Sequence, residues 1–474
     1  MRYTENIEEN ERMTDSLLGT GISFDVKKSP LTVSGKRGVL YYIDGFVKRE
    51  ELIKMRDSCI NAEKDDSADI SQFIKRHLPC ADSYAVGSPE KAAEAIHSGK
   101  LVLLIDTFFG GAVMDIRDFP KRGISEPDKS KTLRGPHEGF TESLITNATL
   151  LRRRIKTPKL RLELFEIGKI TKTQIALCYI EGAADEKLCA SFRKKLSGAV
   201  TDSLVMAQES ICELLFPKKG LRALDPLPTV KYAERPDTAS AMLCEGKILI
   251  LCDTSPSVIC LPAGLFDFLE EPDDYYFPAF TGTYLRLVRL VILVLSVFLV
   301  PVWLYFAEHP GSAPGFLSFV GELDEHSVPL VWQILIIELA VDGLKLASLN
   351  TPSTLSNSLS VVGGLLLGDF AVKSGWFVPQ TVLYSSFTAI ANFIPTNYEF
   401  GYSIKFMRVL LVCLTGAFGL YGLISGSAVI VFVIAATRTA SGKPYLYPVI
   451  PFDAREAKRI IFRTSKTDFF PKKP

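Results

Sequence analysis

The sequence predicts an α/β domain of two lobes followed by an all-α domain that crosses a membrane several times. Most charged residues lie before residue 283 or after residue 441, and several apolar stretches run between these limits. Before residue 262, β-rich runs alternate with amphipathic helical patterns, which is typical of α/β domains. The first 28 residues are polar and lack the apolar core of a signal peptide, so we expect the α/β domain to stay in the cytoplasm.

The domain boundaries follow changes in composition along the chain. Residues 1–35 contain few apolar positions and several acidic ones, so we expect a mobile tail there. The remaining parts are a cytosolic domain over 36–282 with lobes at about 36–130 and 140–270, a membrane domain over 283–440, and a basic cytoplasmic tail over 441–474.

Within the cytosolic domain, short apolar runs bounded by turn residues predict strands, and apolar residues at helical spacing predict helices. The predicted strands are 101–106, 112–116, 160–167, 173–180 and 248–253. The predicted helices are 90–97, 138–155, 186–200, 203–216 and 237–244.

Two segments of this domain resemble each other. Residues 89–107 read PEKAAEAIHSGKLVLLIDT, and residues 236–254 read PDTASAMLCEGKILILCDT. Each reads as a helix with proline in its first turn, a glycine suited to a left-handed helix end, and a buried strand. We infer two related helix-turn-strand units, one in each lobe. The alternative is chance recurrence of a common unit, because the repeat is seen only twice.

Each copy of the repeat ends on an aspartate, Asp106 or Asp253. Carboxylates at strand ends are placed to bind a ligand in a cleft between lobes. The alternative interpretation is that each one caps the turn that follows its strand.

The segment between the lobes is rich in arginine. Arg134 precedes the predicted helix 138–155, and Arg152, Arg153 and Arg154 close it at the end where positive charge is favourable. We expect these side chains to pair with carboxylates of the other lobe or of a neighbouring subunit, the alternative being a solvated helix face. No aromatic side chains are interleaved with the basic ones, so nucleic acid is not an expected partner.

The chain lacks a recognisable catalytic or metal-binding pattern. Its nine cysteines are scattered singly and its five histidines are dispersed. Walker, Rossmann, GxSxG and HExxH patterns do not occur. We therefore expect no enzyme activity, no cofactor and no metal site, with the cysteines reduced in a cytosolic compartment.

The membrane domain contains one clear span at 284–306, and its other apolar stretches are 331–349, 359–372, 376–394, 406–424 and 428–436. The stretch 359–372 is short for a full span and is expected to be re-entrant, and the last two are one bent segment or two separate ones. The stretch 331–349 carries Glu338, Asp342 and Lys345 within one helical stripe. Charges are costly in lipid, so this stripe is expected to line a pore or a polar seam. The alternative is an amphipathic helix at the membrane surface. Since both ends should be cytoplasmic, we expect an even number of crossings, most simply four.

Several blocks of sequence resemble the A-subunit family of spore germination (GerA-type) proteins. These blocks are LRGPHEGFTES from residue 133, RRRIK from 152, ERPD from 234, DDYY from 273, VVGGLLLGDFAV from 361 and PYLYP from 444. The resemblance implies a two-lobed cytosolic domain on a multi-pass domain of the spore inner membrane. It also implies an oligomeric, ion-conducting complex with partner membrane subunits.

One segment distinguishes branches of that family. Nutrient-receptor subunits usually carry Arg-Glu-Ala followed by Arg and Pro after the charged helix, whereas this chain reads LKLASLNTPS over 344–353. In this respect it is more similar to the branch called stage V sporulation protein AF, so direct nutrient sensing is not implied.

Two functions remain open at this point. The first is a subunit of an ion channel or ion-release complex of the spore membrane. The second is a non-conducting receptor or scaffold subunit that binds a ligand or partner through its cytosolic lobes. A secondary transporter is less favoured, because the membrane domain lacks an inverted repeat of broken helices.

Overall fold

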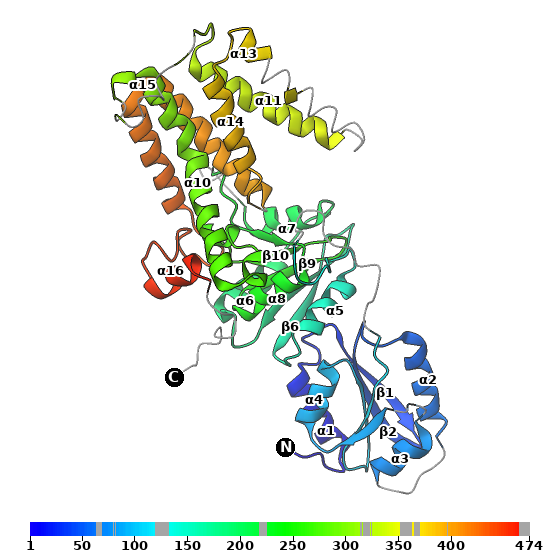
Figure 1. Cartoon of the computed structure of the whole chain (residues 1–474). Helices are drawn as coiled ribbons and strands as arrows, with labels where there is room; N and C mark the ends of the chain where they lie inside the picture. Colours follow the sequence, from blue (N-terminus) through cyan, green and yellow to red (C-terminus); the bar gives the residue numbers. More distant parts are fainter. Residues whose placement is uncertain are drawn as a thin grey trace. The chain divides into compact units, whose positions relative to one another are not determined.

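The chain folds into two compact units, an α/β unit of Met1–Lys218 and Val230–Pro262 and a helical unit of Lys219–Thr229 and Ala263–Pro474 (Figure 1). This confirms the predicted α/β domain and the helical domain that follows it. The computed structural model describes all residues except 63–68, 79, 81, 119–131, 218–224, 313–314, 316–322, 324, 351–362, 365–369, 396 and 464–474.

The first lobe of the α/β unit is an antiparallel sheet in the order β1-β2-β4-β5-β3. Its strands are β1 (Val26–Val33), β2 (Lys36–Ile43), β3 (Ser83–Val86), β4 (Leu101–Ile105) and β5 (Gly111–Met114). Its helices are α1 (Ile7–Leu18), α2 (Arg49–Ile60), α3 (Ile70–His77) and α4 (Pro89–His97).

Helices cover both faces of this sheet. Val39 and Tyr41 of β2 pack in one cluster with α1 and α4, whereas Leu40 packs in another with α2 and α3. Successive residues of a strand point to opposite faces, so a strand covered on both sides must be apolar throughout. This is why all five residues of β4 are buried and why its sequence is a continuous apolar run.

The second lobe has the same arrangement of strands, in the order β6-β7-β9-β10-β8. Its strands are β6 (Leu160–Ile167), β7 (Thr173–Ile180), β8 (Lys231–Ala233), β9 (Ile248–Cys252) and β10 (Val258–Leu261). Its helices are α5 (Leu144–Arg154), α6 (Glu186–Ser197), α7 (Ala207–Leu215) and α8 (Pro236–Cys244). In both lobes the strands, numbered in chain order, lie in the sequence first, second, fourth, fifth, third.

The repeat found in the sequence corresponds to α4-β4 in the first lobe and α8-β9 in the second. Both copies contain a helix and then a buried strand that occupies the third place in its sheet. Gly99 and Gly246 connect helix to strand with φ of 95° and 84°, the left-handed conformation expected of a glycine at a helix end. The predicted strands are therefore present in both copies, in support of a duplication.

The prediction of a mobile tail over residues 1–35 is wrong. Asn6 caps α1, and β1 begins at Val26 as the edge strand of the first sheet. The acidic residues that suggested a tail have partners within the lobe: Lys28 lies 2.9 Å from Glu11 and 2.7 Å from Asp15. The polar composition thus reflects an ion-paired helix face rather than a lack of structure.

The boundary between the units falls at Pro262 rather than at the predicted residue 282. Ala263, Phe268 and Leu269 belong to the core of the helical unit. Phe268 stacks on Phe400 with ring centroids 5.3 Å apart. Residues 263–282, which the composition assigns to the cytosolic domain, are therefore part of the helical unit.

The helical unit consists of α9 (Asp273–Tyr276), α10 (Ala279–Glu308), α11 (Leu330–Asn350), α13 (Ala371–Lys373), α14 (Pro379–Ala391), α15 (Tyr398–Ala436) and α16 (Ala454–Ile461). In the described parts of the chain, α10 and α15 are the helices long and apolar enough to cross a membrane. The helical character of this domain is confirmed, and the expectation of four crossings stays a prediction.

Helix α15 is divided into two arms by Gly419, whose φ of 57° and ψ of −131° are not helical. The arms pack together after this break, since a Cβ placed on Gly426 would lie 2.6 Å from Leu411 and 3.1 Å from Leu414. Figure 1 shows the two orange arms side by side. The first arm, residues 398–418, carries the side chains that form the site described next.

Candidate functional site: a buried charged cluster

Four charged side chains meet inside the helical unit, two from α11 and two from the first arm of α15. Glu338 and Asp342 lie one turn apart on α11, and Lys405 and Arg408 lie one turn apart on α15. We call these four residues the charged cluster. Each helix thus presents one sign of charge to the other.

The cluster is joined by direct ion pairs. Arg408 donates from Nε to Glu338 Oε1 at 2.9 Å, and its Nη2 lies 2.8 Å from the same oxygen. Lys405 Nζ lies 3.2 Å from Glu338 Oε2 and also donates to Asp342 Oδ2. Glu338 therefore binds both cations, and Lys405 bridges both carboxylates.

Three members of the charged cluster lie away from solvent, and the fourth, Asp342, has a side chain that is 30% exposed. Glu338 is 7% exposed, Lys405 5% and Arg408 0%. Removing a charge from water costs several kcal/mol, which ion pairs and additional hydrogen bonds must offset. The additional bonds come from backbone and amide oxygens: Arg408 Nη1 donates to the Ser296 carbonyl of α10 at 2.9 Å and to Asn392 Oδ1 at 3.5 Å. Arg408 thus connects α10, α11 and α15.

Lys345, the third charge of the predicted stripe, has different neighbours. Its Nζ lies 4.6 Å from the ring centroid of Phe393 and 5.7 Å from that of Tyr402. A cation over aromatic faces is stabilised by the ring quadrupole. The stripe therefore divides into two acidic residues within the charged cluster and a lysine held by aromatic rings.

Sequence reasoning missed Lys405 and Arg408. The apolar segment predicted from the sequence begins at residue 406, so it excludes Lys405 and gives Arg408 no role. Lys405 and Arg408 lie on one face of an apolar helix, as Glu338 and Asp342 do on theirs, and they carry the opposite charge. This complementary charge is the feature of the sequence that indicates a pairing of the two helices.

The arginines predicted to make contacts between lobes or subunits have separate roles. Arg152 is fully buried and makes a two-pronged ion pair with Asp25, from Nε at 2.7 Å and from Nη2 at 3.1 Å. This pair joins α5 of the second lobe to the residue just before β1 of the first. Arg153 and Arg154 pair with Glu138 of their own lobe at 3.1 and 2.8 Å, and Arg134 is exposed before α5.

Asp106 and Asp253 act at equivalent places in the two lobes. Asp106 Oδ1 accepts from the backbone N–H of Ile7 at 3.3 Å, and Asp253 Oδ1 accepts from that of Leu144 at 3.1 Å. Ile7 and Leu144 are the first residues of α1 and α5, whose N–H groups lack partners within the helix. Each carboxylate therefore caps the start of a helix in its own lobe.

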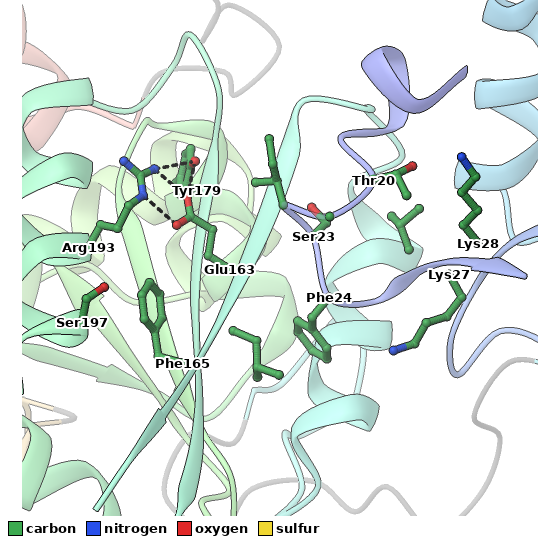
Figure 2. A pocket seen from close by; sticks show the side chains of 14 residues that line it. Thr20, Ser23, Phe24, Lys27, Lys28, Glu163, Phe165, Tyr179, Arg193 and Ser197 are labelled. Carbon is green, nitrogen blue, oxygen red and sulfur yellow. Dashed lines mark hydrogen bonds and ion pairs between the residues drawn. The ribbon is translucent and has the colours of Figure 1, made fainter. Parts of the chain in front are cut away.

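A hollow of about 790 Å³ lies between the two lobes (Figure 2). Its wall includes Glu163, which accepts from Arg193 Nε at 2.7 Å and from the Tyr179 hydroxyl at 2.6 Å. Burial alone would raise the pKa of Glu163, but these hydrogen bonds bring the pKa below its usual value. Lys27 and Lys28, on the opposite side in Figure 2, also have acidic partners. Asp106 and Asp253 do not line this hollow.

Comparisons with known proteins cover nearly the whole chain. Residues 13–473 match the sequence profile described as Bacillus/Clostridium GerA spore germination protein. Stage V sporulation protein AF of Bacillus subtilis (strain 168) is 31% identical over 98% of this chain and 94% of that protein. The uncharacterized membrane protein YfkQ of the same organism is 30% identical over 97% of this chain and 89% of that protein.

A solved structure is also similar. It is the crystal structure of the N-terminal domain of the A subunit of the Bacillus megaterium spore germinant receptor GerK3. The match covers 55% of this chain and 96% of that one, with 25% identity and a TM-score of 0.40.

Proposed function

Because the chain belongs to the GerA family of spore germination proteins, we propose that it is a non-enzymatic membrane subunit of a spore germination complex and that its charged cluster gates an ion path. The helical unit crosses the spore inner membrane several times, and the α/β unit lies in the cytoplasm. The partners are further copies of the chain, other membrane subunits of the complex, and the ions that it releases.

The observation that carries this proposal is a cluster of four paired charges among apolar helices, three of them buried. Ionisable side chains at membrane depth are costly, and where they occur they commonly mark ion pathways or switches. In the arrangement described here the two carboxylates are neutralised by Lys405 and Arg408. A path lined by paired charges is closed to cations, because no net field draws them in.

Opening follows from separation of α11 and the first arm of α15. That movement would free Glu338 and Asp342, whose carboxylates then attract cations and repel anions. The aromatic contacts of Lys345 lie on the same side of α11 and leave this cation apart from the two acidic residues. The charged cluster is thus a latch whose closed state is the ion-paired one.

The test is the double variant Glu338→Gln with Asp342→Asn in the full-length protein, reconstituted in planar bilayers. Loss of the ion pairs should ease opening, so the quantity to measure is the cation conductance of each open channel. We expect this conductance to fall by about tenfold or more, since clefts lined by one sign of charge raise local counter-ion concentration by about 10- to 1,000-fold. Glu325→Gln, which removes an exposed carboxylate of the same unit, is the matched control and should leave the current unchanged.

A second variant separates gating from folding. Glu338→Gln combined with Arg408→Gln removes one charge of each sign, so no unpaired buried charge remains. With assembly intact, this variant should open more readily, because the ion pair that joins α11 to α15 is absent.

The alternative is a non-conducting scaffold subunit, and the pairing of both carboxylates favours it. A fully paired cluster is also what a purely structural connection of three helices would require. In that case the double variant lowers thermal stability or complex assembly, and current through the complexes that still assemble stays normal.

A further inference from the structure

The C-terminal part of the chain exposes apolar and basic side chains next to each other. Before α16, Val449, Ile450 and Phe452 are 46%, 50% and 75% exposed. Arg455 and Lys458 are exposed on α16 itself, and Phe462, which follows it, is 49% exposed. Clustered exposed apolar groups at a basic rim are unusual on a surface that faces only water. We call residues 449–462 the C-terminal segment.

Hydrogen bonds hold this segment beside the start of α10. Arg286 of α10 donates from Nη1 to the carbonyls of Arg459 at 3.0 Å and Ile460 at 3.1 Å. The backbone N–H of Arg463 donates to Thr283 Oγ1 at 3.2 Å. In Figure 1, α16 (red) lies against the lower part of α10 (green). The last turn of α16 is therefore fixed at the level of residues 283–286.

Arg286 is itself held firmly. Its Nε lies 3.2 Å from Asp274 and its Nη2 lies 3.3 Å from Glu270, and Arg289 Nη1 lies 3.0 Å from Asp274. These acidic groups precede α10 in the chain. Ion pairs and hydrogen bonds thus connect α9, α10 and α16 at the end of α10 where its apolar part begins.

Residues 283–289 of α10 lie where a membrane surface would meet that helix. Arg286 and Arg289 stand in the first part of the helix, and a continuous apolar run follows Arg289. Cationic residues at the end of a span mark its cytoplasmic boundary. A short helix fixed at this boundary, with basic and aromatic side chains exposed, has the features of an interfacial anchor.

We propose that the C-terminal segment binds anionic phospholipid headgroups at the cytoplasmic surface of the membrane that α10 crosses. Ile450 and Phe452 enter the boundary between headgroups and acyl chains, and Arg455 and Lys458 pair with lipid phosphates. Helix α16 presents a positive charge to this anionic partner, because its acidic residue, Glu456, is already paired with Arg459 at 2.9 Å and Arg455 and Lys458 are exposed. The inference rests on the proposed placement of the helical unit in a membrane.

The test uses the full-length chain reconstituted in vesicles, with the exposed Cys244 and Cys413 changed to serine. A fluorescent NBD group is attached at Phe452→Cys, and vesicles contain phosphatidylcholine alone or mixed with phosphatidylglycerol. We expect a quencher attached near the lipid headgroup to reduce the emission, more strongly with phosphatidylglycerol, and aqueous iodide to have little effect.

Charge reversal tests the role of the basic residues. Arg455→Glu with Lys458→Glu should lower the lipid-bound population at least roughly fivefold for each residue, the contribution expected of one basic side chain near an anionic surface. The effect should vanish in vesicles of phosphatidylcholine alone. Equal quenching in both lipids, with no effect of charge reversal, would overturn recognition of anionic lipid.

Two further probe positions distinguish this inference from the proposed function. Val291→Cys, on the exposed side of α10, reports whether that helix lies in lipid, and Ile170→Cys, 80% exposed in the α/β unit, gives the value for a water-facing probe. If the lipid-attached quencher does not reduce the emission of the probe at residue 291, the membrane placement is wrong and this inference is wrong with it. If it does so while the probe at residue 452 behaves like the one at residue 170, this inference alone is wrong.

A last outcome concerns a second copy of the chain. A Phe452 probe protected from both quenchers, to a degree that rises with the protein-to-lipid ratio, would mean that another subunit covers the segment. That result would replace the lipid with a protein partner and overturn the proposal.

Discussion

The two lobes of the α/β unit share a framework and differ in what their first helices bind. Asn10 of α1 and Asn147 of α5 accept from the backbone N–H groups of Thr4 and Thr141 at 2.9 and 2.8 Å. Each asparagine also donates back to the carbonyl of its threonine. Together with the common sheet order, these contacts mark α1 and α5 as corresponding helices.

Five residues after each asparagine the charge is reversed. Asp15 of α1 binds Lys28 and the Tyr41 hydroxyl of its own lobe, at 2.7 and 2.9 Å. Arg152 of α5 instead binds Asp25 of the other lobe. The residue at this one position of the duplicated helix therefore decides whether the helix makes an ion pair within its own lobe, as Asp15 does, or with the other lobe, as Arg152 does.

The largest effect is expected at Arg152. Arg152→Met leaves the Asp25 carboxylate buried without its cation, so the free energy of unfolding of the α/β unit should fall by about 3–5 kcal/mol. Asp15→Asn should lower it by about 1 kcal/mol or less, because Asp15 is partly exposed and Lys28 keeps Glu11 as a partner. Amide hydrogen exchange of β2 and β7 in the full-length protein measures both.

A matched variant isolates the buried charge. Adding Asp25→Asn to Arg152→Met removes the unpaired carboxylate and should restore much of the loss. Equal losses for Arg152→Met and Asp15→Asn would show that the two helices do not differ in the way described.

A second effect distinguishes the ends of the repeated helices, where the first lobe has His97 and the second has Cys244. His97 is 1% exposed, and burial, aided by the nearby charge of Arg152, lowers its pKa to about 3. In the unfolded chain the pKa is about 6.5, so the unfolded state binds more protons between these values. The stabilisation is complete above pH 6.5 and decreases as the pH falls toward 3.

The expected slope is a loss of about 1.4 kcal/mol in free energy of unfolding per pH unit below 6.5. His97→Cys, which copies the residue of the second lobe, should remove that slope. Protection of the β4 amides against hydrogen exchange, measured from pH 7 to pH 4, is the readout. An unchanged slope in the variant would assign the acid sensitivity to another group.

The smallest effects are expected to be equal in the two lobes. Asp106→Ala and Asp253→Ala each remove an acceptor from the first N–H of a helix, so each should cost about 1 kcal/mol of stability. Exchange of the α1 and α5 amides measures the two separately. The exposed Asp202→Ala is the control and should change stability by about 0.5 kcal/mol at most. A large inequality between Asp106 and Asp253 would argue against equivalent roles.

Local patterns predicted much of the α/β unit. The bounds of β6 and β7 agree with the predicted 160–167 and 173–180, because turn residues interrupt the apolar pattern at both ends. The helix predicted over 138–155 begins only at Leu144, where Ser143 supplies the cap. An N-terminal boundary depends on which of several polar residues takes the capping position, and composition does not distinguish them.

The sequence by itself determined the strands β4, β5, β6, β7 and β9, the duplicated helix-turn-strand units and the division into an α/β part and an apolar helical part. These features depend on periodicity and on residues near one another in the chain. Only the tertiary structure decided which charges meet. Glu338 and Arg408 are separated by 70 residues, and Asp25 and Arg152 by 127. An isolated acidic residue on an apolar stripe shows that a partner is needed, but the partner's identity depends on how the helices pack.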